Sequence, residues 1–363
     1  MRTFVHRPQS VFLRRALFQV HLWIGVAAGL YVFVVCVTGT ALMFRIDMQK
    51  AAYPRLFTPS APGPLVEPAT IMEHVQAAYP DGRLSGVDAP TTARSTYLAY
   101  VSKGSEFLTV LVDPVNAQVL GLLPDRTWVR TLQDLHFDLL AGRTGRVVNG
   151  VGALLLLAMC VTGLVIWWPG IGQWRRAVTV DFTRSWKRVN WDLHSAVGIW
   201  TVALTAMWAI TGANFAFPGP IRAMVNRLSP ISVVRAPQSA PSATSASPPP
   251  TWPSVVEGAR ARVPGQFVAR VVVPSNDRGA FLVTFSAVSP TPVGTAELRS
   301  VYIDQHSGAV LSEPPRGART AGDTVMAWLS PLHVGSFGGP VVRVAWLILG
   351  LAPPLLFVTG FVM

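Results

Sequence analysis

Four of the seven histidines occur in two matched sequence settings. His21 and His194 each have a glycine four residues later and a Thr-Gly pair seventeen residues later. His136 and His333 each follow a leucine, with an arginine ten residues later and a Thr-Gly pair twenty-six residues later. The matched residues are Gly25 and Gly198, Thr38-Gly39 and Thr211-Gly212, Arg146 and Arg343, and Thr162-Gly163 and Thr359-Gly360. Chance rarely repeats so many offsets, and imidazole is the commonest metal ligand, so the spacing indicates a duplicated ligand site.

Each matched histidine opens or precedes an uncharged apolar run. The runs cover 20–44, 147–168, 193–217 and 344–363, and a membrane span needs about 20 residues. The chain is 13% charged, whereas soluble domains carry about 25%. Four such runs in one chain are poorly explained as buried core helices. The sequence therefore predicts four transmembrane helices, the last one kinked by its two adjacent prolines.

The distribution of charge predicts the orientation of these helices. The tail 1–19 holds four arginines and no acid, and the loop 169–192 holds five basic residues against two acids. Short basic segments stay in the cytoplasm, whereas long segments cross regardless of charge. The segments 45–146 and 218–343 are therefore expected outside, in the periplasm of a Gram-negative cell. This distribution accounts for the net charge of +12, so we expect a lipid bilayer and no nucleic acid as the partner.

This orientation places the histidines at two depths. His21 and His194 open the outward-running helices near the cytoplasmic face, and His136 and His333 precede the inward-running helices near the periplasmic face. Two histidines from different helices suit the axial positions of a b-type haem, so we expect two b-type haems. A zinc site is a weaker alternative because no cysteine or acid clusters with the pairs. A proton relay is weaker still because the spans hold no carboxylate, and plain polar anchoring stays open.

The matched threonines, glycines and arginines fit the same hypothesis. Each Thr-Gly pair is expected to flank a haem from a helix that does not ligate it, although small residues also serve ordinary helix packing. Arg146 and Arg343 are placed to hold the propionates of the periplasmic haem, with Arg143 nearby. The cytoplasmic candidates are Arg14, Arg15, Lys187 and Arg188, which membrane anchoring also explains.

The soluble segments repeat as well. IMEHVQAAYP resembles SVVEGARARVP, and FLTVLVDPVNAQVLG resembles RSVYIDQHSGAVLS. Each copy predicts a short helix stopped by proline, followed by strands and a tight turn. The predicted fold class is an all-α four-helix transmembrane bundle with two periplasmic α+β modules and an internal two-fold repeat. The remaining predicted boundaries are a cytoplasmic tail 1–19, modules 45–126 and 254–322, lead-in segments 127–146 and 323–343, a cytoplasmic loop 169–192 and a periplasmic linker 218–253.

The sequence resembles the PepSY-associated transmembrane proteins over nearly its whole length. The likeness lies in LFQVHLWIGVAAGLYVFVVCVTGTALMF, VDPVNAQVLG, LQDLHFDLLAGRTGRVVNGVGALLLLAMCVTGLVIWWPG, WDLHSAVGIW and SPLHVGSFGGP. This resemblance implies an inner-membrane protein linked to iron uptake. Its siderophore-reductase members, of the ferrioxamine reductase type, are dihaem proteins that reduce ferric siderophores in the periplasm. The resemblance implies haem-ligand roles for His21, His136, His194 and His333.

The expected function is therefore a transmembrane electron conduit that reduces a ferric siderophore. No G-x-G-x-x-G follows a strand, so the electron donor is expected to be quinol or a separate cytoplasmic reductase. The cofactor carries the chemistry, and no general acid or nucleophile is expected. Two alternatives stay open: a non-enzymatic membrane regulator or assembly factor, and a haem-dependent reductase of another periplasmic acceptor.

Overall fold

A computed structural model of the protein describes residues 12–232, 236–239, 248–292, 298–312 and 319–363. Within these residues the chain forms two compact units. The membrane unit contains 12–43, 128–231 and 321–363, and the sheet unit contains the described residues of 44–127 and 232–320. The chain therefore leaves the membrane unit twice to build the sheet unit. Parts of the predicted tail 1–19 and linker 218–253 lie outside the described residues.

In the described part of the chain, four helical stretches are long and apolar enough to cross a bilayer. The prediction of a multi-pass membrane protein is thereby confirmed. At 1.5 Å per residue, the 31 residues of α2 or of α9 extend beyond a hydrocarbon core of about 30 Å. The stretches are α2 (Phe12–Leu42), α7 (Gly142–Trp167), α9 (Trp186–Ala216) and the Gly339–Val362 segment, which contains α13 (Gly339–Gly350) and α14 (Ala352–Val362).

These helices begin several residues before the apolar runs that predicted them. α2 starts at Phe12 rather than at residue 20, and α9 starts at Trp186 rather than at residue 193. Arginine and lysine interrupt an apolar run but are good helix formers, so hydropathy marks the lipid-buried part and not the helix end. As a consequence, His21 and His194 lie inside continuous helices.

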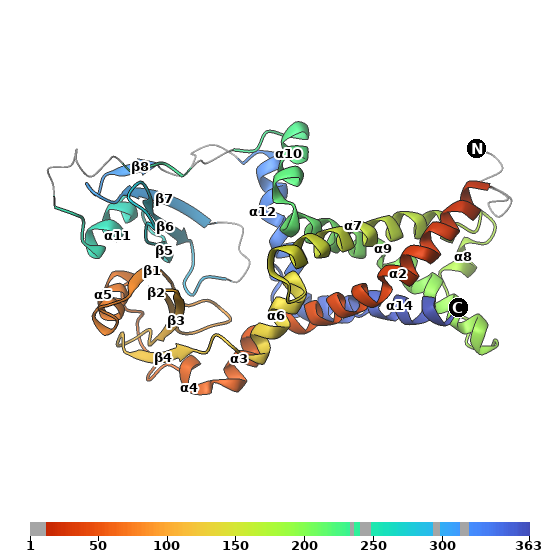
Figure 1. Ribbon diagram of the computed structural model, residues 1–363, viewed down its shortest axis with the longest axis horizontal. Coiled ribbons are helices and arrows are strands. Elements are labelled where there is room, and N and C mark those ends of the chain that lie inside the picture. Colours follow the sequence, from red (N-terminus) through yellow and green to blue (C-terminus); the bar gives the residue numbers. More distant parts are fainter. Residues whose placement is uncertain (1–11, 233–235, 240–247, 293–297, 313–318) are drawn as a thin grey trace. The chain divides into compact units, whose positions relative to one another are not determined.

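The spanning helices pack side by side in the membrane unit (Figure 1). α7 packs against both α2 and α9, and α14 packs against the same two helices. Large apolar side chains on other faces of these helices stay exposed, including Leu30 at 65%, Trp200 at 74% and Ile348 at 64%. Such faces are expected for helices surrounded by lipid tails.

Two shorter helices carry the other matched histidines. α6 (Trp128–Asp138) bears His136, and α12 (Ala321–Val334) bears His333. α6 ends in a tight turn in which Leu139 and Leu140 adopt φ values of 54° and 60°. The side-chain amide of Asn149 in α7 donates to the carbonyl of His136 at 2.7 Å. That bond satisfies a carbonyl at the end of α6 and ties this helix to a spanning helix.

The predicted linker 218–253 does not begin as a linker. It begins with α10 (Pro218–Leu228), directly after α9. Proline at the first helical position fixes φ at a helical value and lacks the amide proton that would be unpaired there. Pro218 therefore starts a helix where a linker was predicted.

The sheet unit contains an eight-stranded antiparallel sheet in the order β4-β3-β2-β1-β5-β6-β7-β8, as far as the described residues show (Figure 1). Helix α5 (Pro68–Ala78) packs against β1, and α11 (Trp252–Arg260) packs against β6 and β7. Two short helices, α3 (Arg45–Ala52) and α4 (Pro54–Phe57), precede the sheet. The strands are β1 Arg83–Asp88, β2 Tyr97–Lys103, β3 Glu106–Val112, β4 Val119–Leu123, β5 Phe267–Val272, β6 Ala280–Ser286, β7 Leu298–Asp304 and β8 Val310–Ser312.

The two predicted modules share this sheet through β1 and β5, which corrects the expectation of two modules each with a small sheet. In two separate sheets, β1 and β5 would each be an exposed edge strand. Pairing them with each other removes these two edges and leaves β4 and β8 at the edges of the joined sheet. Gly86 allows the close approach, because a Cβ there would lie 2.6 Å from the Val271 carbonyl oxygen. Arg270 on β5 pairs with Asp88 on β1. Counted outward from this junction, the four strands of each half follow one another in sequence order. The two-fold repeat itself stays a prediction.

Two buried aspartates shape the turns between the last two strands of each half. Asp113 Oδ1 accepts a hydrogen bond from the Val115 amide at 2.8 Å, and Asp304 Oδ1 accepts one from the Ser307 amide at 2.8 Å. Burial alone would raise the pKa of Asp113, but amide hydrogen bonds, including one from Ser60, outweigh it and lower that pKa. The carboxylate form of Asp113 therefore stabilises its turn.

Candidate functional site

The structure brings the four matched histidines together as two pairs. In the first pair, His21 of α2 and His194 of α9 have ring centroids 6.5 Å apart and ring planes at 88°. In the second pair, His136 of α6 and His333 of α12 have centroids 6.4 Å apart and planes at 48°. These are the partners that the depth argument assigns to each other. Their role as metal ligands stays a prediction.

Each imidazole contacts the threonine of a matched Thr-Gly pair on a neighbouring helix. The Nδ1 atoms of His21 and His194 lie 2.9 Å and 3.0 Å from the hydroxyls of Thr162 and Thr359, respectively. These threonines were predicted to flank a haem, and in the structure they hydrogen-bond the histidines themselves. The matched Thr-Gly offsets in the sequence were the signal that pointed to these threonines.

The second pair repeats the arrangement. His333 Nδ1 lies 2.7 Å from the hydroxyl of Thr211. His136 Nδ1 lies 3.3 Å from the hydroxyl of Thr38 and 2.9 Å from the Val35 carbonyl oxygen. A carbonyl can only accept, so His136 carries its proton on Nδ1.

The threonine geometry favours the same tautomer at the other three histidines. Thr162, Thr211 and Thr359 each donate their hydroxyl proton to the carbonyl four residues earlier, at 2.8 Å. Their oxygen atoms then accept a hydrogen bond from Nδ1–H of the imidazole. Nε2 is left with its lone pair, which is the atom and the form that bind a metal.

The glycines of the Thr-Gly pairs make room for the rings. A Cβ added at Gly39 would lie 2.6 Å from Cε1 of His136, and one at Gly360 would lie 3.0 Å from Cε1 of His194. At Gly163 the distance to Cε1 of His21 would be 3.2 Å. Each of these imidazoles therefore lies against a helix backbone that only glycine exposes so closely.

A cavity of about 670 Å³ surrounds the first pair. Both His21 and His194 line it, and its volume falls within the roughly 300–1,000 Å³ of small-molecule and cofactor sites. Most of the wall is apolar. The charged side chains on it are Arg14, Arg176, Arg188 and Asp192. Of the four cations predicted from the sequence, Arg14 and Arg188 line the cavity, and Arg15 and Lys187 do not. Arg176 of the short helix α8 (Trp174–Ala177) and Asp192 of α9 were not predicted, because neither belongs to a repeated spacing.

The arginines predicted for the second pair lie near the starts of spanning helices. Arg146 is exposed in α7, and Arg343 is half-buried in α13. Their role toward a bound group stays a prediction.

The pair geometry suits one metal ion between two imidazoles. Two imidazole nitrogens on opposite sides of a metal ion, each about 2 Å from it, would put the ring centres about 6 Å apart, close to the observed 6.5 Å and 6.4 Å. In the part of the chain that the structure describes, no three His, Cys, Asp or Glu side chains come together as a metal site. Each pair alone could supply two ligands to a metal ion, and a macrocycle such as a porphyrin could supply others.

Comparison with known proteins identifies the family. The family model described as PepSY-associated TM region matches residues 18–363. An uncharacterised protein of Pseudomonas aeruginosa is 31% identical over 85 residues, which make up 23% of this chain. The aligned part spans about a fifth of that relative, 20% of its length. Because the family match extends over nearly the whole chain, the protein belongs to the PepSY-associated transmembrane family.

Proposed function

We propose that this protein is an inner-membrane dihaem electron conduit that reduces ferric siderophores in the periplasm and releases Fe(II). The observation that carries the proposal is the geometry of the histidine pairs. Both pairs have nearly equal ring separations, 6.5 Å and 6.4 Å, and in both the Nδ1 atoms are engaged by threonine hydroxyls. Two unrelated polar anchors would not be expected to share both features.

The protein's contribution is to hold and tune two redox groups. His21 and His194 would hold one b-type haem, His136 and His333 would hold the other, and the bound haems would supply one-electron redox chemistry. The threonine hydroxyls fix the ring orientation and strengthen each imidazole as a donor. The apolar wall of the first-pair cavity keeps water away from the iron ligands, which influences the reduction potential.

The two pairs are separated by most of a membrane thickness. Thr38, the partner of His136, lies seventeen residues beyond His21 on α2, which corresponds to about 25 Å of helix rise. Aromatic side chains occupy the interval. Phe33 of α2 contacts Phe357 of α14 with ring centroids 5.8 Å apart, and Phe357 also lines the first-pair cavity. These side chains would keep the space between the two levels free of water.

The proposed direction of electron flow rests on the orientation of the helices, which the basic segments of the chain predict. The basic loop 169–192 favours the cytoplasm for the first pair, where quinol or a separate cytoplasmic reductase would donate electrons. The second pair would then serve the periplasmic side. The acceptor class rests on the resemblance to siderophore reductases. One electron converts chelated Fe(III) to Fe(II), which hard oxygen chelators bind weakly, so the metal leaves without any bond to the protein being made or broken.

Haem content tests the first part of the proposal. Purified protein should contain two haems per chain in a pyridine haemochrome assay, and replacing either histidine of one pair with alanine should remove one of them. His74→Ala is the matched control, because His74 is exposed on α5 of the sheet unit, and this variant should keep both. Colourless wild-type protein would contradict the proposal and favour the regulator. Four histidine variants with full haem content would contradict the ligand assignment.

Reoxidation tests the acceptor. Anaerobically reduced protein mixed with a ferric hydroxamate siderophore should lose its reduced absorption bands while a ferrous chelator captures about one Fe(II) per electron. The iron-free siderophore is the control and should leave the bands unchanged. If the ferric siderophore leaves the protein reduced and Cu(II) oxidises it, the acceptor is another periplasmic metal.

A further inference from the structure

The charged side chains of the first-pair cavity gather at one end. Arg14 precedes His21 by seven residues on α2, Arg188 precedes His194 by six on α9, and Arg176 lies in the short helix α8 that precedes α9. In the opposite direction the cavity reaches Val32, eleven residues beyond His21 on α2. The cavity therefore has a cationic end on one side of the imidazoles and an apolar end on the other.

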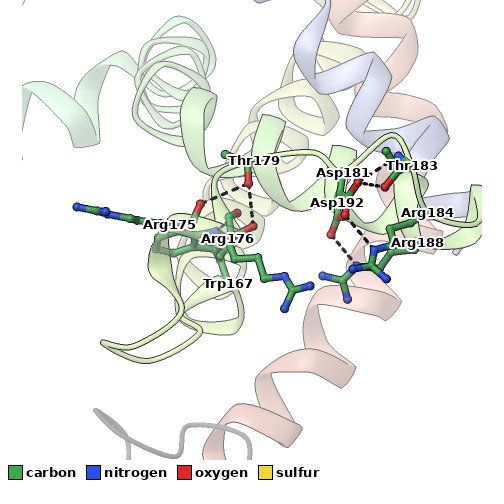
Figure 2. Close-up of polar contacts among 10 residues, drawn as sticks. Trp167, Arg175, Arg176, Thr179, Asp181, Thr183, Arg184, Arg188 and Asp192 are labelled. Atoms are coloured by element: carbon green, nitrogen blue, oxygen red, sulfur yellow. Dashed lines mark hydrogen bonds and ion pairs between the residues drawn. The ribbon is translucent and has the colours of Figure 1, made fainter.

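The charge at the cationic end is only partly balanced by the protein. Three arginines against one aspartate on the wall leave a net positive charge of two. Arg188 Nε lies 3.0 Å from Asp192 Oδ1, and this pair is drawn in Figure 2. Figure 2 shows Arg176 extending toward the same region. Both arginines and Asp192 also line a small adjoining hollow. A ligand with two negative charges would complete the balance.

The third arginine is held at the end of a spanning helix. The Arg14 guanidinium donates from Nε and Nη2 to the Ile166 carbonyl oxygen at 3.2 Å and 2.6 Å. Ile166 lies in the last turn of α7, where the carbonyls have no partner within the helix. This contact fixes the guanidinium beside the cavity, and a positioned arginine binds carboxylates well.

We propose that Arg14, Arg176 and Arg188 form a dicarboxylate site that holds the two propionates of a haem bound between His21 and His194. The inference rests on the proposed function, since it assumes that a haem binds there. It adds that the macrocycle lies in the apolar part of the cavity with both carboxylates toward the cationic end. The chemical class of the ligand is thus a flat, apolar dicarboxylic acid.

Two neighbouring cations provide matched controls. Arg15 and Lys187 adjoin Arg14 and Arg188 in sequence but are not among the residues that line the cavity. The Lys187 ammonium lies instead over the Trp186 ring, 5.9 Å from its centroid. Removing the charges of Arg15 and Lys187 lowers the basicity of this membrane face by a similar amount without touching the cavity.

Haem release is the first measurement. Holoprotein is mixed with excess apomyoglobin, and the two haems should leave in two phases. Arg14→Gln, Arg176→Gln and Arg188→Gln should each accelerate one phase by about 10- to 100-fold, the value of one charge-assisted hydrogen bond. The other phase reports the second pair and should be unchanged. Arg15→Gln and Lys187→Gln should release both haems at the wild-type rates.

Haemin dimethyl ester gives the second measurement, because it lacks both carboxylate charges. Apoprotein from haem-deficient cells should bind haemin at the first pair at least 10-fold more tightly than the ester, and the triple glutamine variant should lose this preference. Equal binding of both compounds by wild-type protein, or unchanged release from all three single variants, would overturn this assignment while leaving the haem ligands intact. Wild-type protein that binds neither compound would overturn the proposed function, and with it this inference.

Discussion

Removal of the Thr211 hydroxyl is the most direct test of the threonine contacts. Thr211 Oγ1 lies 2.7 Å from His333 Nδ1, the shortest of the four contacts, and Thr211 is only 1% exposed. Thr211→Val preserves the shape of the side chain but deletes the acceptor. A buried donor left without a partner costs about 1–3 kcal/mol, and loss of such an outer-shell partner typically weakens a metal site by about 10- to 100-fold. We expect the second-pair haem to dissociate faster by that factor.

Thr38→Val is the control that the chain itself offers. His136 Nδ1 is 2.9 Å from the Val35 carbonyl oxygen and 3.3 Å from the Thr38 hydroxyl. The carbonyl remains after the substitution, so haem dissociation should change by no more than about threefold, below 1 kcal/mol. Thr211→Ser keeps a hydroxyl and should restore the wild-type rate. Dissociation into apomyoglobin, followed by absorbance, measures all three variants.

A redox titration separates this reasoning from a general packing defect. Without the hydrogen bond from Nδ1–H, the His333 imidazole donates less electron density and stabilises ferric iron less. The midpoint potential of one haem should therefore rise in Thr211→Val, by about 59 mV for each tenfold loss of preference for the ferric form. Equal effects of Thr211→Val and Thr38→Val, or faster release with no change in potential, would refute the proposed role of the threonine.

Four further substitutions test contacts within each of the two units. Gly39→Ala places a Cβ 2.6 Å from His136 Cε1 and should halve the haem content, whereas a Cβ at Gly219 of α10 has no described atom within 4 Å, so Gly219→Ala should keep both haems in the same absorbance assay. Gly86→Ala places a Cβ 2.6 Å from the β5 backbone, so we expect about 1–3 kcal/mol of destabilisation in urea unfolding followed by proteolysis of the sheet unit. Asp113 has a lowered pKa, so its stabilisation is complete above the unfolded pKa of about 3.9 and disappears as the pH falls through the folded value. Asp113→Asn should thus lower the thermal midpoint more at pH 7 than below the unfolded pKa, and an equal loss at both would contradict the carboxylate's role.

The pairing of the histidines could be predicted from the sequence because depth in a bilayer is a one-dimensional quantity. The position of a residue along a spanning helix gives its depth, and matched offsets give matched depths. Rotation about the helix axis is not fixed in this way. Whether Thr162 faces His21 depends on how α7 packs against α2. The sequence therefore predicted that the threonine and the histidine lie at the same depth, but not that they form a hydrogen bond.

The joined sheet could not be predicted for a related reason. Alternating apolar residues show that a strand exists and which face it buries, but not which edge it pairs with. β1 and β5 come from the two long segments that leave the membrane unit, and no local turn connects them. Gly86 within a strand was the available signal, since glycine there often marks a close approach of another backbone. A single residue of that kind is too common to identify its partner.

The two histidine pairs reach nearly the same separation by different structural means. His21 and His194 lie within long helices, whose own hydrogen bonds fix the backbone. His136 and His333 lie on short helices that are tied to the spanning helices by side chains. The Asn149 amide donates to the His136 carbonyl at 2.7 Å, and the Trp208 indole donates to the His333 carbonyl at 3.1 Å.

Different supports that give 6.5 Å and 6.4 Å indicate that the separation itself is what the sequence specifies. Helix packing alone provides no reason for such agreement, because the backbones at the two levels are held by different contacts. A shared bound group would provide one, since two imidazoles on opposite sides of one metal ion, each nitrogen about 2 Å from it, stand about 6 Å apart whatever helices carry them. The agreement between the two levels is what the proposed haem at each pair would require.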